Sequence, residues 1–466
     1  MKQTDFQTYS SEKDSKKQEA IFEKRKWVGV TNKCNNQCIF CLDGDIKNKF
    51  HKPLGEIKKE IDSGIKEGYT RLVLSGGEAT IHPEFIEIIK MGKKAGYKKI
   101  QVISNGRMFS YIPFIDKAIS AGINEITFSI HGHNSELHNS LTSVKESFKQ
   151  TIEGIKNALG KKIIVNCDIV INKRNIKYFP EIMDFLLGLG VREFDLLHIM
   201  PYGNAWKNKD SLLYSLEENI HSLKKGIEMG KSNGAVIWTN RFPPEYLEGY
   251  EEYIQDPYKL LDEINGRKKD FLLGFKKNKK LDCYGKKCEF CCMKELCEFL
   301  FLCNDSLKQN KNIEEKKKDE IIITKECYDK LGYGIFKLQK RKNLILTLVP
   351  PSYDYKNYSN ITPRIENILP KIYPLLKSNN YKLKNIPPCF LEPKYRNRIL
   401  KDSFKIDNKF IKNSEIDLEK CALHFIENKK IMGKVCKECK LYNNCDGLFQ
   451  KYIMLYGFKE LKPILK

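Results

Sequence analysis

Three cysteines near the N-terminus have the spacing of ligands to an iron–sulfur cluster. Cys34, Cys38 and Cys41 are separated by three and two residues, and they follow an apolar segment, 27–31, that is predicted to be a strand. Soft thiolates favour zinc or iron–sulfur clusters, but a structural zinc site normally has four ligands. The only local candidate for a fourth ligand is His51. We therefore favour a [4Fe–4S] cluster in which one iron stays open to a small molecule.

This segment resembles the motif of the radical S-adenosylmethionine (SAM) superfamily. The resemblance rests on the Cys-x3-Cys-x2-Cys spacing directly after the first strand and on an aromatic residue, Phe40, just before the third cysteine. It implies that the open iron binds the amino and carboxylate groups of SAM, and that the reduced cluster cleaves SAM to a 5′-deoxyadenosyl radical. It also implies that Phe40 packs near the adenine. The cofactors supply the difficult chemistry, and the protein positions them.

A glycine pair at the end of the second predicted strand supports the same interpretation. Residues 71–75 run into Gly76, Gly77 and Glu78. Glycine tolerates positive φ and lets the backbone approach a ligand closely. An ordinary strand-to-helix turn is the alternative interpretation of so short a motif. Its position resembles the family's site for the amino group of SAM, so these three residues are predicted to bind the cofactor.

Small polar residues on later strands are further candidates for cofactor binding. Side chains alternate between the two faces of a strand, and Ser129 and Asn166 are thereby predicted to face the lumen of a barrel. The resemblance implies contacts with the ribose and carboxylate of SAM, for which Ser104, Asn105, Ser129 and Asn166 are the candidates. Ordinary hydrogen-bonded polar groups of the barrel are the alternative for each. No catalytic acid or base can be named.

A second group of six cysteines lies within residues 283–303. So many thiols in a Lys-rich segment indicate metal binding. The predicted ligands of an auxiliary [4Fe–4S] cluster are Cys283, Cys288, Cys291 and Cys297, and zinc bound by the same four is the alternative. Cys292 cannot easily reach the metal that its neighbour binds. Cys303 lies in an apolar run and is a possible substitute.

A third group lies near the C-terminus. Cys436, Cys439 and Cys445 resemble the core of the SPASM and twitch auxiliary-cluster domains, but Phe449 stands where the full SPASM pattern has another cysteine. The predicted fourth ligand is Cys389, which follows two prolines, and Cys421 is the alternative. We therefore expect one or two auxiliary [4Fe–4S] clusters.

The elements that must position these residues follow an α/β pattern. Six apolar segments alternate with helical patterns over 27–240, which predicts a parallel sheet in a partial (β/α)6 TIM-like barrel followed by irregular cysteine-rich domains. In such a barrel, functional groups lie at the C-terminal ends of the strands. Five glycines are predicted to end helices in the left-handed conformation: Gly68, Gly96, Gly122, Gly160 and Gly190.

We expect five regions along the chain. They are a polar N-terminal extension (1–26), the radical SAM core (27–240), a cysteine-rich auxiliary-cluster region (241–303), a linker-like segment rich in Lys, Asn and Glu (304–342), and a SPASM-like auxiliary-cluster region (343–466).

Composition narrows the class of protein. The chain has 466 residues, 41% of them hydrophobic and 30% charged, which is typical of a globular protein. It shows no run of ~18 apolar residues and no secretory signal, so a cytoplasmic enzyme without membrane contact is expected. The net charge of +23 suits an acidic electron donor such as flavodoxin or ferredoxin. A compositional bias and an RNA partner are the alternatives.

The resemblance implies a radical SAM enzyme that abstracts hydrogen from its substrate. Many members of the family modify peptides, so a peptide or protein substrate and a maturase-type modification are expected. Modification of RNA or of a small metabolite is the alternative. An iron–sulfur electron carrier or a zinc-binding protein is more remote, because neither explains Gly76, Gly77 and Glu78 beside an open three-cysteine site.

Overall fold

The protein is described from a computed structural model. The residues that it describes are 23–46, 49–277, 279–281, 283–308, 320–325, 344–350, 358–400, 410–412 and 415–465. They form two compact units. The first, the barrel unit, contains the described residues up to Phe242 together with Gly285–Cys292, and the second, the C-terminal unit, contains Pro243–Tyr284 and the residues from Met293 onward. Most of the predicted extension 1–26 and of the linker 304–342 lies outside the described residues.

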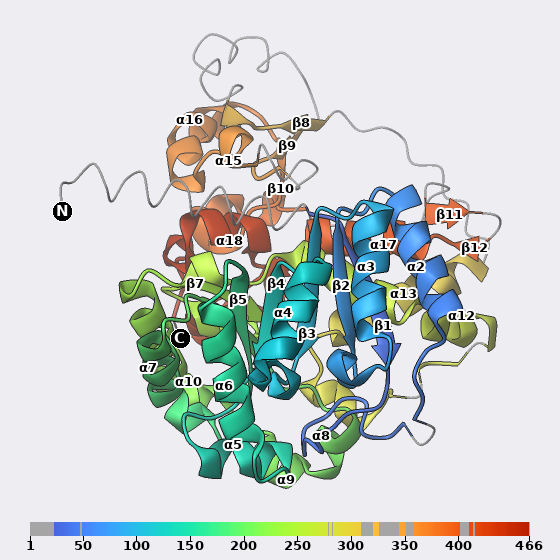
Figure 1. Cartoon of the computed structure of the whole chain (residues 1–466). Coiled ribbons are helices and arrows are strands. Elements are labelled where there is room, and N and C mark those ends of the chain that lie inside the picture. Colours follow the sequence, from blue (N-terminus) through green and yellow to red (C-terminus); the bar gives the residue numbers. More distant parts are fainter. Residues whose placement is uncertain are drawn as a thin grey trace. The chain divides into compact units, whose positions relative to one another are not determined.

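A seven-stranded parallel sheet forms the centre of the barrel unit (Figure 1). Its strand order follows the chain from one edge, β1, to the other, β7, as right-handed strand–helix repetition dictates. The strands are β1 (Arg25–Thr31), β2 (Arg71–Gly76), β3 (Lys99–Ser104), β4 (Glu125–Ser129), β5 (Ile164–Ile171), β6 (Glu193–His198) and β7 (Val236–Asn240). The predicted fold class is confirmed, with a seventh strand that sequence reasoning did not separate from the six.

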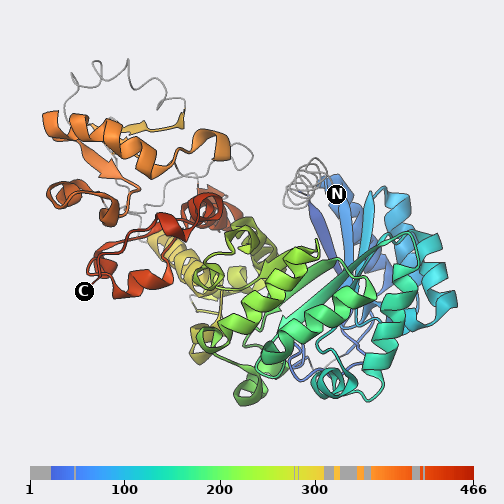
Figure 2. The ribbon, with the colours of Figure 1, turned by 90° about the vertical axis from the view of Figure 1, so that its left-hand side faces the viewer.

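Helices cover one face of this sheet (Figure 2), and buried apolar side chains of the strands and helices form the core. On β1, Val28 and Val30 are fully buried, whereas Trp27 is 44% exposed. On β5, Cys167 is fully buried and Asp168 is half-buried. The alternation of a strand therefore places one set of apolar side chains under the helices, and the other set, which includes both Trp27 and Asp168, on the opposite face.

The helices of the barrel unit end largely as predicted. They are α2 (Leu54–Lys66), α3 (Phe85–Ala95), α4 (Ile112–Ala121), α5 (Ser135–Thr142), α6 (Ser147–Leu159), α7 (Phe179–Leu189), α8 (Gly203–Lys207), α9 (Lys209–Leu212) and α10 (Leu216–Ser232). Gly96 ends α3 with φ 100° and donates to the carbonyls of Gly92 and Lys93. Gly160 is the exception to the prediction: its φ of −74° is right-handed, so any residue would serve there.

The C-terminal unit is built from short elements. Its helices are α11 (Leu260–Gly266), α12 (Lys268–Lys277), α13 (Lys294–Lys308), α15 (Tyr358–Ile361), α16 (Ile365–Ser378), α17 (Leu418–Asn428) and α18 (Gln450–Tyr456). Parallel strands β8 (Glu320–Ile322), β9 (Ile345–Thr347) and β10 (Lys382–Lys384) form one small sheet in the order β10, β9, β8. Two hairpin-like pairs complete it: β11 (Ile411–Lys412) with β12 (Glu415–Ile416), and β13 (Lys430–Ile431) with β14 (Leu448–Phe449).

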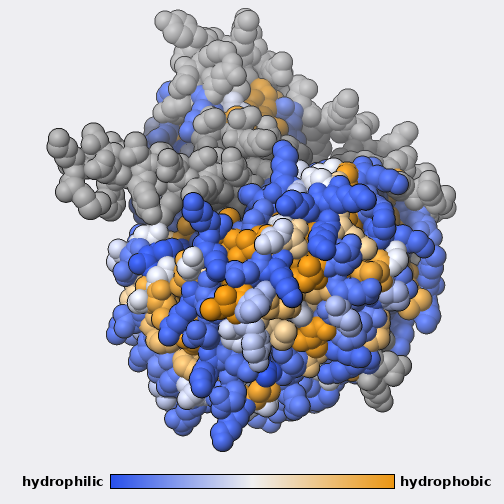
Figure 3. Space-filling view, viewed as in Figure 1, coloured by the Kyte–Doolittle hydropathy of each residue, from blue (hydrophilic) through white to orange (hydrophobic). Residues whose placement is uncertain are grey.

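Polar residues cover most of the molecular face in Figure 3, with hydrophobic residues scattered among them. Across the described residues, none of the helices has the length and apolar character needed to cross a membrane.

A buried ion-pair network joins the N-terminal ends of β2 and β4. The Arg71 guanidinium donates to Glu23 at 2.7 Å and also to Glu125, and these three side chains are 7 to 12% exposed. Gln101 accepts a further bond from Arg71 and donates to Thr127 at 2.9 Å. Such a network has a desolvation cost, but removing one partner leaves an uncompensated buried charge.

Replacing Arg71 with Ala is therefore expected to lower the free energy of unfolding by about 3–5 kcal/mol, because Glu125 would stay buried without its partner. Urea denaturation of the whole chain measures the change. The matched control is Lys58→Ala, which removes an exposed pair with Asp62 and should cost only about 0.3–0.5 kcal/mol. Equal costs for the two variants would show that the network does not stabilise the barrel.

Candidate functional site

The first cysteine loop follows β1 and holds three half-buried cysteines close together. Burial raises the pKa of Cys34 to about 11 and that of Cys38 well above the ordinary range, and the neighbouring thiols raise both further. Burial also raises the pKa of Cys41. The Asn36 N–H donates to the Cys34 sulfur at 3.3 Å. Thiols in such a place become thiolates only when a bound metal compensates their charge, so the donor set fits a metal cluster.

The three thiols would each bind a different iron of a [4Fe–4S] cluster. Within the described part of the chain, no three His, Cys, Asp or Glu side chains are grouped around the position of one metal ion. The fit therefore rests on the softness, burial and mutual proximity of the thiols, and ligation by Cys34, Cys38 and Cys41 stays a prediction.

The glycine turn at the end of β2 is packed against the start of this loop. The Gly77 N–H donates to the Thr31 carbonyl at 2.7 Å, and the Glu78 N–H donates to the Lys33 carbonyl at 2.8 Å. A Cβ on Gly76, whose φ is +136°, would lie 2.0 Å from the Thr31 oxygen, and a Cβ on Gly77 would lie 2.2 Å from the Lys33 oxygen. The glycines thus give room to the backbone of the cysteine loop, as well as being predicted to face a ligand.

The Glu78 carboxylate joins the ends of β2 and β3. It is 1% exposed and accepts hydrogen bonds from the Ser104 hydroxyl at 2.8 Å, from the Asn105 N–H at 2.7 Å, and from both the N–H and the hydroxyl of Thr80. Burial raises the pKa of Glu78, and these hydrogen bonds oppose that rise. Ser104 and Glu78 are thus hydrogen-bonded to each other. Their contact with a cofactor stays a prediction.

Two side chains from the segment after β3 hold the cysteine loop directly. Asn105 donates to the Asn35 side chain at 2.6 Å, and its amide nitrogen lies 4.0 Å from the Cys34 sulfur. Arg107 donates to the Asn35 carbonyl and, at 3.2 Å, to the side chain of Asn36. The loop is therefore anchored from the third strand as well as from the second.

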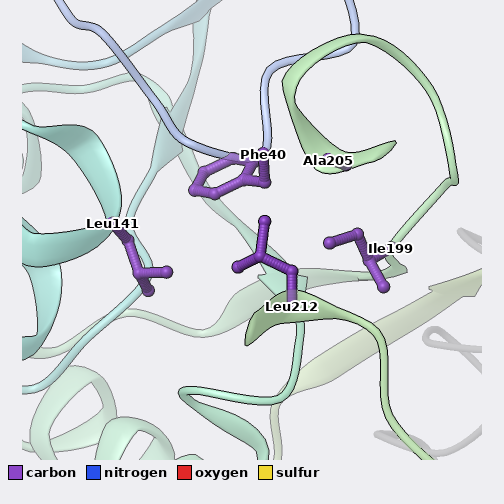
Figure 4. Packing of buried hydrophobic residues seen from close by; sticks show 5 residues of the cluster. All are labelled: Phe40, Leu141, Ile199, Ala205 and Leu212. Atoms are coloured by element: carbon purple, nitrogen blue, oxygen red, sulfur yellow. The ribbon is translucent and has the colours of Figure 1, made fainter. Parts of the chain in front are cut away.

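Phe40 anchors the other end of the loop in a hydrophobic cluster (Figure 4). Its ring is 8% exposed and packs with Leu141, Ile199, Ala205 and Leu212. The ring also meets the buried imidazole of His131 edge to face, with centroids 4.7 Å apart. Contact between Phe40 and adenine stays a prediction, whereas its packing shows that it holds the loop on the barrel.

Helix α8, which follows β6 in the chain, also holds the loop. The Asn204 N–H donates to the Cys41 carbonyl at 2.9 Å, and the Asn204 side chain donates to the Cys38 carbonyl at 3.1 Å. A Cβ on Gly203 would lie 2.2 Å from the Leu42 carbonyl oxygen, and Gly203 has a φ of +53°. A residue larger than glycine would push α8 off the loop.

The remaining predicted cofactor residues lie on the inner face of the sheet. Ser129 is half-buried at the end of β4, in register with Asp168 on β5. Asn166 is 8% exposed, and its side-chain oxygen has no hydrogen-bond partner among the residues that the structure describes. An orphaned acceptor at this position fits a bound hydroxyl group, such as that of a ribose.

The second cysteine group is divided between the two units. Cys288, Cys291 and Cys292 belong to the barrel unit, whereas Cys283 and Cys297 belong to the C-terminal unit. Cys292 donates to the buried Met200 sulfur at 3.7 Å. Binding of one cluster by Cys283, Cys288, Cys291 and Cys297 stays a prediction.

The third cysteine group gathers four thiols within the C-terminal unit. Cys389 lies near Cys436 and Cys439, and the thiol of Cys389 helps to raise the pKa of Cys445, which burial brings to about 11. The N–H groups of Leu441 and Ile464 point at the Cys439 sulfur at 3.4 and 3.3 Å, and that of Gly447 points at the Cys445 sulfur at 3.4 Å. Such N–H donors suit thiolate ligands.

Cys421, the alternative fourth ligand, lies elsewhere in the C-terminal unit. It is fully buried on α17 and forms a hydrogen-bonded pair with the fully buried Cys303 of α13. This bond raises the pKa of Cys303 and lowers that of Cys421. The structure therefore joins these two candidates to each other.

Sequence reasoning missed the residues that hold the first loop in place. Arg107, Asn204 and Asn208 contact its backbone, the last through a bond to the Ile39 carbonyl at 3.0 Å. Asn204 lies 166 residues from its partner Cys38. No local pattern marks an asparagine or arginine with such a distant partner.

Parts of this chain are similar to known proteins. The sequence model of the Radical SAM superfamily matches residues 28–186. A probable GTP 3′,8-cyclase of Sulfurisphaera tokodaii is 27% identical over 50% of this chain and 72% of its own length. The corresponding protein of Saccharolobus solfataricus is 29% identical over 47% of this chain and 69% of its own length.

Two solved structures are also similar. Streptococcus suis SuiB bound to precursor peptide SuiA has a TM-score of 0.39 at 15% identity, over 53% of this chain. The match spans 56% of the SuiB chain, or just over half. Methylornithine synthase (PylB) has a TM-score of 0.37 at 20% identity, over 51% of this chain and 77% of its own.

The close packing at Gly77 predicts that Gly77→Ala will deplete the first cluster. The new Cβ would meet the Lys33 carbonyl at 2.2 Å and displace the start of the cysteine loop. Iron analysis after anaerobic reconstitution should show a loss approaching the ~4 irons of one [4Fe–4S] cluster. The control is Gly188→Ala in α7, where a Cβ would meet nothing within 4 Å. Wild-type iron in Gly77→Ala would contradict the packing argument.

The grouping of the C-terminal thiols predicts that Cys389→Ala will also remove ~4 irons per chain. Cys389 is the fourth thiol beside Cys436, Cys439 and Cys445. Cys421→Ala is the matched control, because that buried thiol pairs with Cys303. Iron content measured for both variants decides the point. A loss in Cys421→Ala without one in Cys389→Ala would reverse the assignment.

Proposed function

We propose that this chain, whose residues 28–186 match the sequence model of the Radical SAM superfamily, is a radical SAM enzyme that abstracts hydrogen from a small-molecule substrate, with nucleotides as the first candidate class. The proposal is carried by the similarity of the barrel to probable GTP 3′,8-cyclases. It favours the small-metabolite alternative of the sequence analysis over a peptide substrate.

In this proposal the first loop holds the cluster, and the ends of β2 and β4 together with Asn166 of β5 hold SAM. Cys34, Cys38 and Cys41 would supply one thiolate to each of three irons. A bound [4Fe–4S] cluster with SAM supplies a 5′-deoxyadenosyl radical. Asn166 would accept a hydrogen bond from a ribose hydroxyl through its unpartnered oxygen. The loop's anchors keep these groups in register.

Two carboxylates on the inner face of the sheet help to define which class of substrate could bind there. Asp168 and Asp195 are in register near the middle of β5 and β6, and Asp168 is also in register with Ser129, the last residue of β4. Asn240 donates to Asp195. This face suits substrate groups that donate hydrogen bonds, such as amines, amides and hydroxyls. These two carboxylates favour a peptide as the second candidate substrate. A nucleotide would have to bind at this face through its base or its sugar.

The other two cysteine groups and the positive net charge would serve electron transfer in this proposal. Auxiliary clusters at the second and third groups, the latter SPASM-like, would accept or relay electrons. The excess of basic residues, +23 in all, would steer an acidic electron donor such as flavodoxin or ferredoxin toward the enzyme.

The experiment is anaerobic incubation with SAM, dithionite and either uniformly deuterated GTP or deuterium-labelled peptides. Mass spectrometry then follows 5′-deoxyadenosine. We expect the wild-type protein to form 5′-deoxyadenosine and to transfer deuterium into it from GTP. The Cys34→Ala/Cys38→Ala/Cys41→Ala variant should form none, because it lacks the only predicted cluster with an open iron.

The outcomes separate the two levels of the proposal. Formation of 5′-deoxyadenosine by the triple variant would reject the first loop as the SAM-cleaving site. Deuterium transfer from a labelled peptide and not from GTP would replace the nucleotide by the second candidate. The Cys421→Ala variant serves as a control for the loss of a buried thiol.

A further inference from the structure

A buried histidine just beyond the end of β4 has no part in the proposed function. His131 lies two residues after Ser129, the last residue of β4, and it is 3% exposed. The Ile130 N–H donates to the Asp168 carbonyl of β5 at 3.0 Å, so the extended pairing continues past the strand. Alternation then places the His131 side chain on the same face as Ser129, at the C-terminal ends of the strands, where barrel enzymes bind their ligands.

Contacts from three sides hold the backbone and the ring of His131. Its N–H donates to Nδ1 of His138 at 3.2 Å, and its carbonyl accepts from the side chain of Asn175 at 3.2 Å. The ring lies nearly parallel to that of His138, with centroids 5.8 Å apart, and it meets the Phe40 ring at a steep angle, with centroids 4.7 Å apart. The imidazole is therefore fixed in place before any ligand binds.

The hydrogen bond from β5 decides which ring nitrogen of His131 carries the proton. The Val170 N–H donates to Nδ1 at 3.3 Å. A backbone N–H can only donate, so Nδ1 is the acceptor and the proton of the neutral ring is on Nε2. Burial, and after it the neighbouring His138, keep the pKa of His131 well below its usual value. Nε2 is therefore a neutral donor with a fixed direction.

This Nε2–H donor is left without an acceptor. Among the residues that the structure describes, none accepts a hydrogen bond from Nε2 of His131. The Nε2 of His138 also lacks a partner, but that atom is sealed from the surface, whereas the Nε2 of His131 is not. Polar groups at buried sites are normally hydrogen-bonded. A donor that is held rigidly, lacks a partner and stays accessible can bind the acceptor atom of a ligand.

The surroundings of His131 indicate what kind of acceptor fits. The rings of Phe40 and His138 lie against it, and among the described residues no carboxylate or cation shifts its pKa. An anionic acceptor would be desolvated here without a countercharge, whereas a neutral nitrogen of a flat ring suits aromatic neighbours. SAM and the nucleotide of the proposed function share one such group, a purine ring.

We propose that His131 is a ligand-binding residue of the barrel unit and that its Nε2–H donates a hydrogen bond to an acceptor nitrogen of a purine ring. The ring is either the adenine of SAM or the base of a nucleotide substrate, and binding measurements distinguish the two. The inference rests on the proposed function in one respect, namely that the barrel binds these molecules. It adds the residue that recognises the ring.

The test measures binding by the full chain after anaerobic reconstitution, without a reductant, so that SAM is not cleaved. Equilibrium dialysis gives the dissociation constants of SAM and of GTP. His131→Asn keeps an acceptor for the Val170 N–H and removes the Nε2–H. We expect it to bind one of the two ligands roughly five- to tenfold more weakly, the effect of one neutral hydrogen bond, with unchanged iron content. His131→Gln, whose amide nitrogen can replace Nε2, should restore part of the affinity.

His138→Asn is the matched control. It keeps an acceptor for the His131 N–H and removes an Nε2–H that is sealed inside the protein, so it should bind both ligands as the wild type does. A second readout changes the ligand instead of the protein. It uses deaza analogues of SAM and of GTP, in which one acceptor nitrogen of the purine is replaced by C–H. The wild-type protein should bind one of these analogues more weakly than its parent, and His131→Asn should not distinguish the two.

The results separate this inference from the proposed function. Weaker binding of SAM by His131→Asn would identify the ring as adenine, and weaker binding of GTP would identify it as the base of the substrate. Unchanged binding of both ligands, or wild-type protein that binds every deaza analogue as tightly as its parent, would overturn only the role of His131. Loss of iron in His131→Asn would assign His131 to holding Phe40 and the cysteine loop, and would overturn its role as well. Wild-type protein that binds neither SAM nor GTP would overturn the proposed function and this inference with it.

Discussion

Two backbone hydrogen bonds hold the cysteine loop against the end of the second strand, and the rest of the site depends on them. The donors are the N–H groups of Gly77 and Glu78, and the acceptors are the carbonyls of Thr31 and Lys33. The contact is possible only because glycine leaves space where a Cβ would meet a carbonyl oxygen. The placement of three thiols is thereby linked to the place predicted to bind the amino group of SAM.

The same principle of anchoring extends around the barrel. Glu78 is hydrogen-bonded to Ser104 and Asn105 at the end of β3. Asn204, in the segment after β6, is hydrogen-bonded to the cysteine loop. A cluster loop that had to order itself on binding would lose part of its affinity to conformational entropy. Here contacts from several strands order it in advance, so the cysteines are preorganised for the metal.

Much of this could be predicted from short patterns in the sequence. The spacing of Cys34, Cys38 and Cys41 and the Gly-Gly-Glu turn predict a SAM site from residues that are neighbours in the chain, and the structure packs the turn against the cysteine loop. The prolines before Cys389 pointed to a fixed position, and the structure places that thiol beside Cys436 and Cys439. These are local signals with a local physical cause.

What could not be predicted depends on contacts between distant residues. Asn204 and Arg107 are ordinary polar residues until the sheet brings them to the loop. The turn at Gly77 and Glu78 is hydrogen-bonded to backbone carbonyls of the cysteine loop. A pattern of side chains in the sequence cannot predict such a contact between two backbones. The division of the second cysteine group between two units also has no mark in the spacing of Cys283, Cys288, Cys291 and Cys297.

The central claim is that one cluster, and only one, has an iron left open for SAM. Mössbauer spectroscopy of protein reconstituted with iron-57, recorded with and without SAM, tests it directly. The account predicts that SAM changes the isomer shift of a single iron site, and that this change is absent when Cys34, Cys38 and Cys41 are replaced. Spectra that are identical with and without SAM would contradict the account.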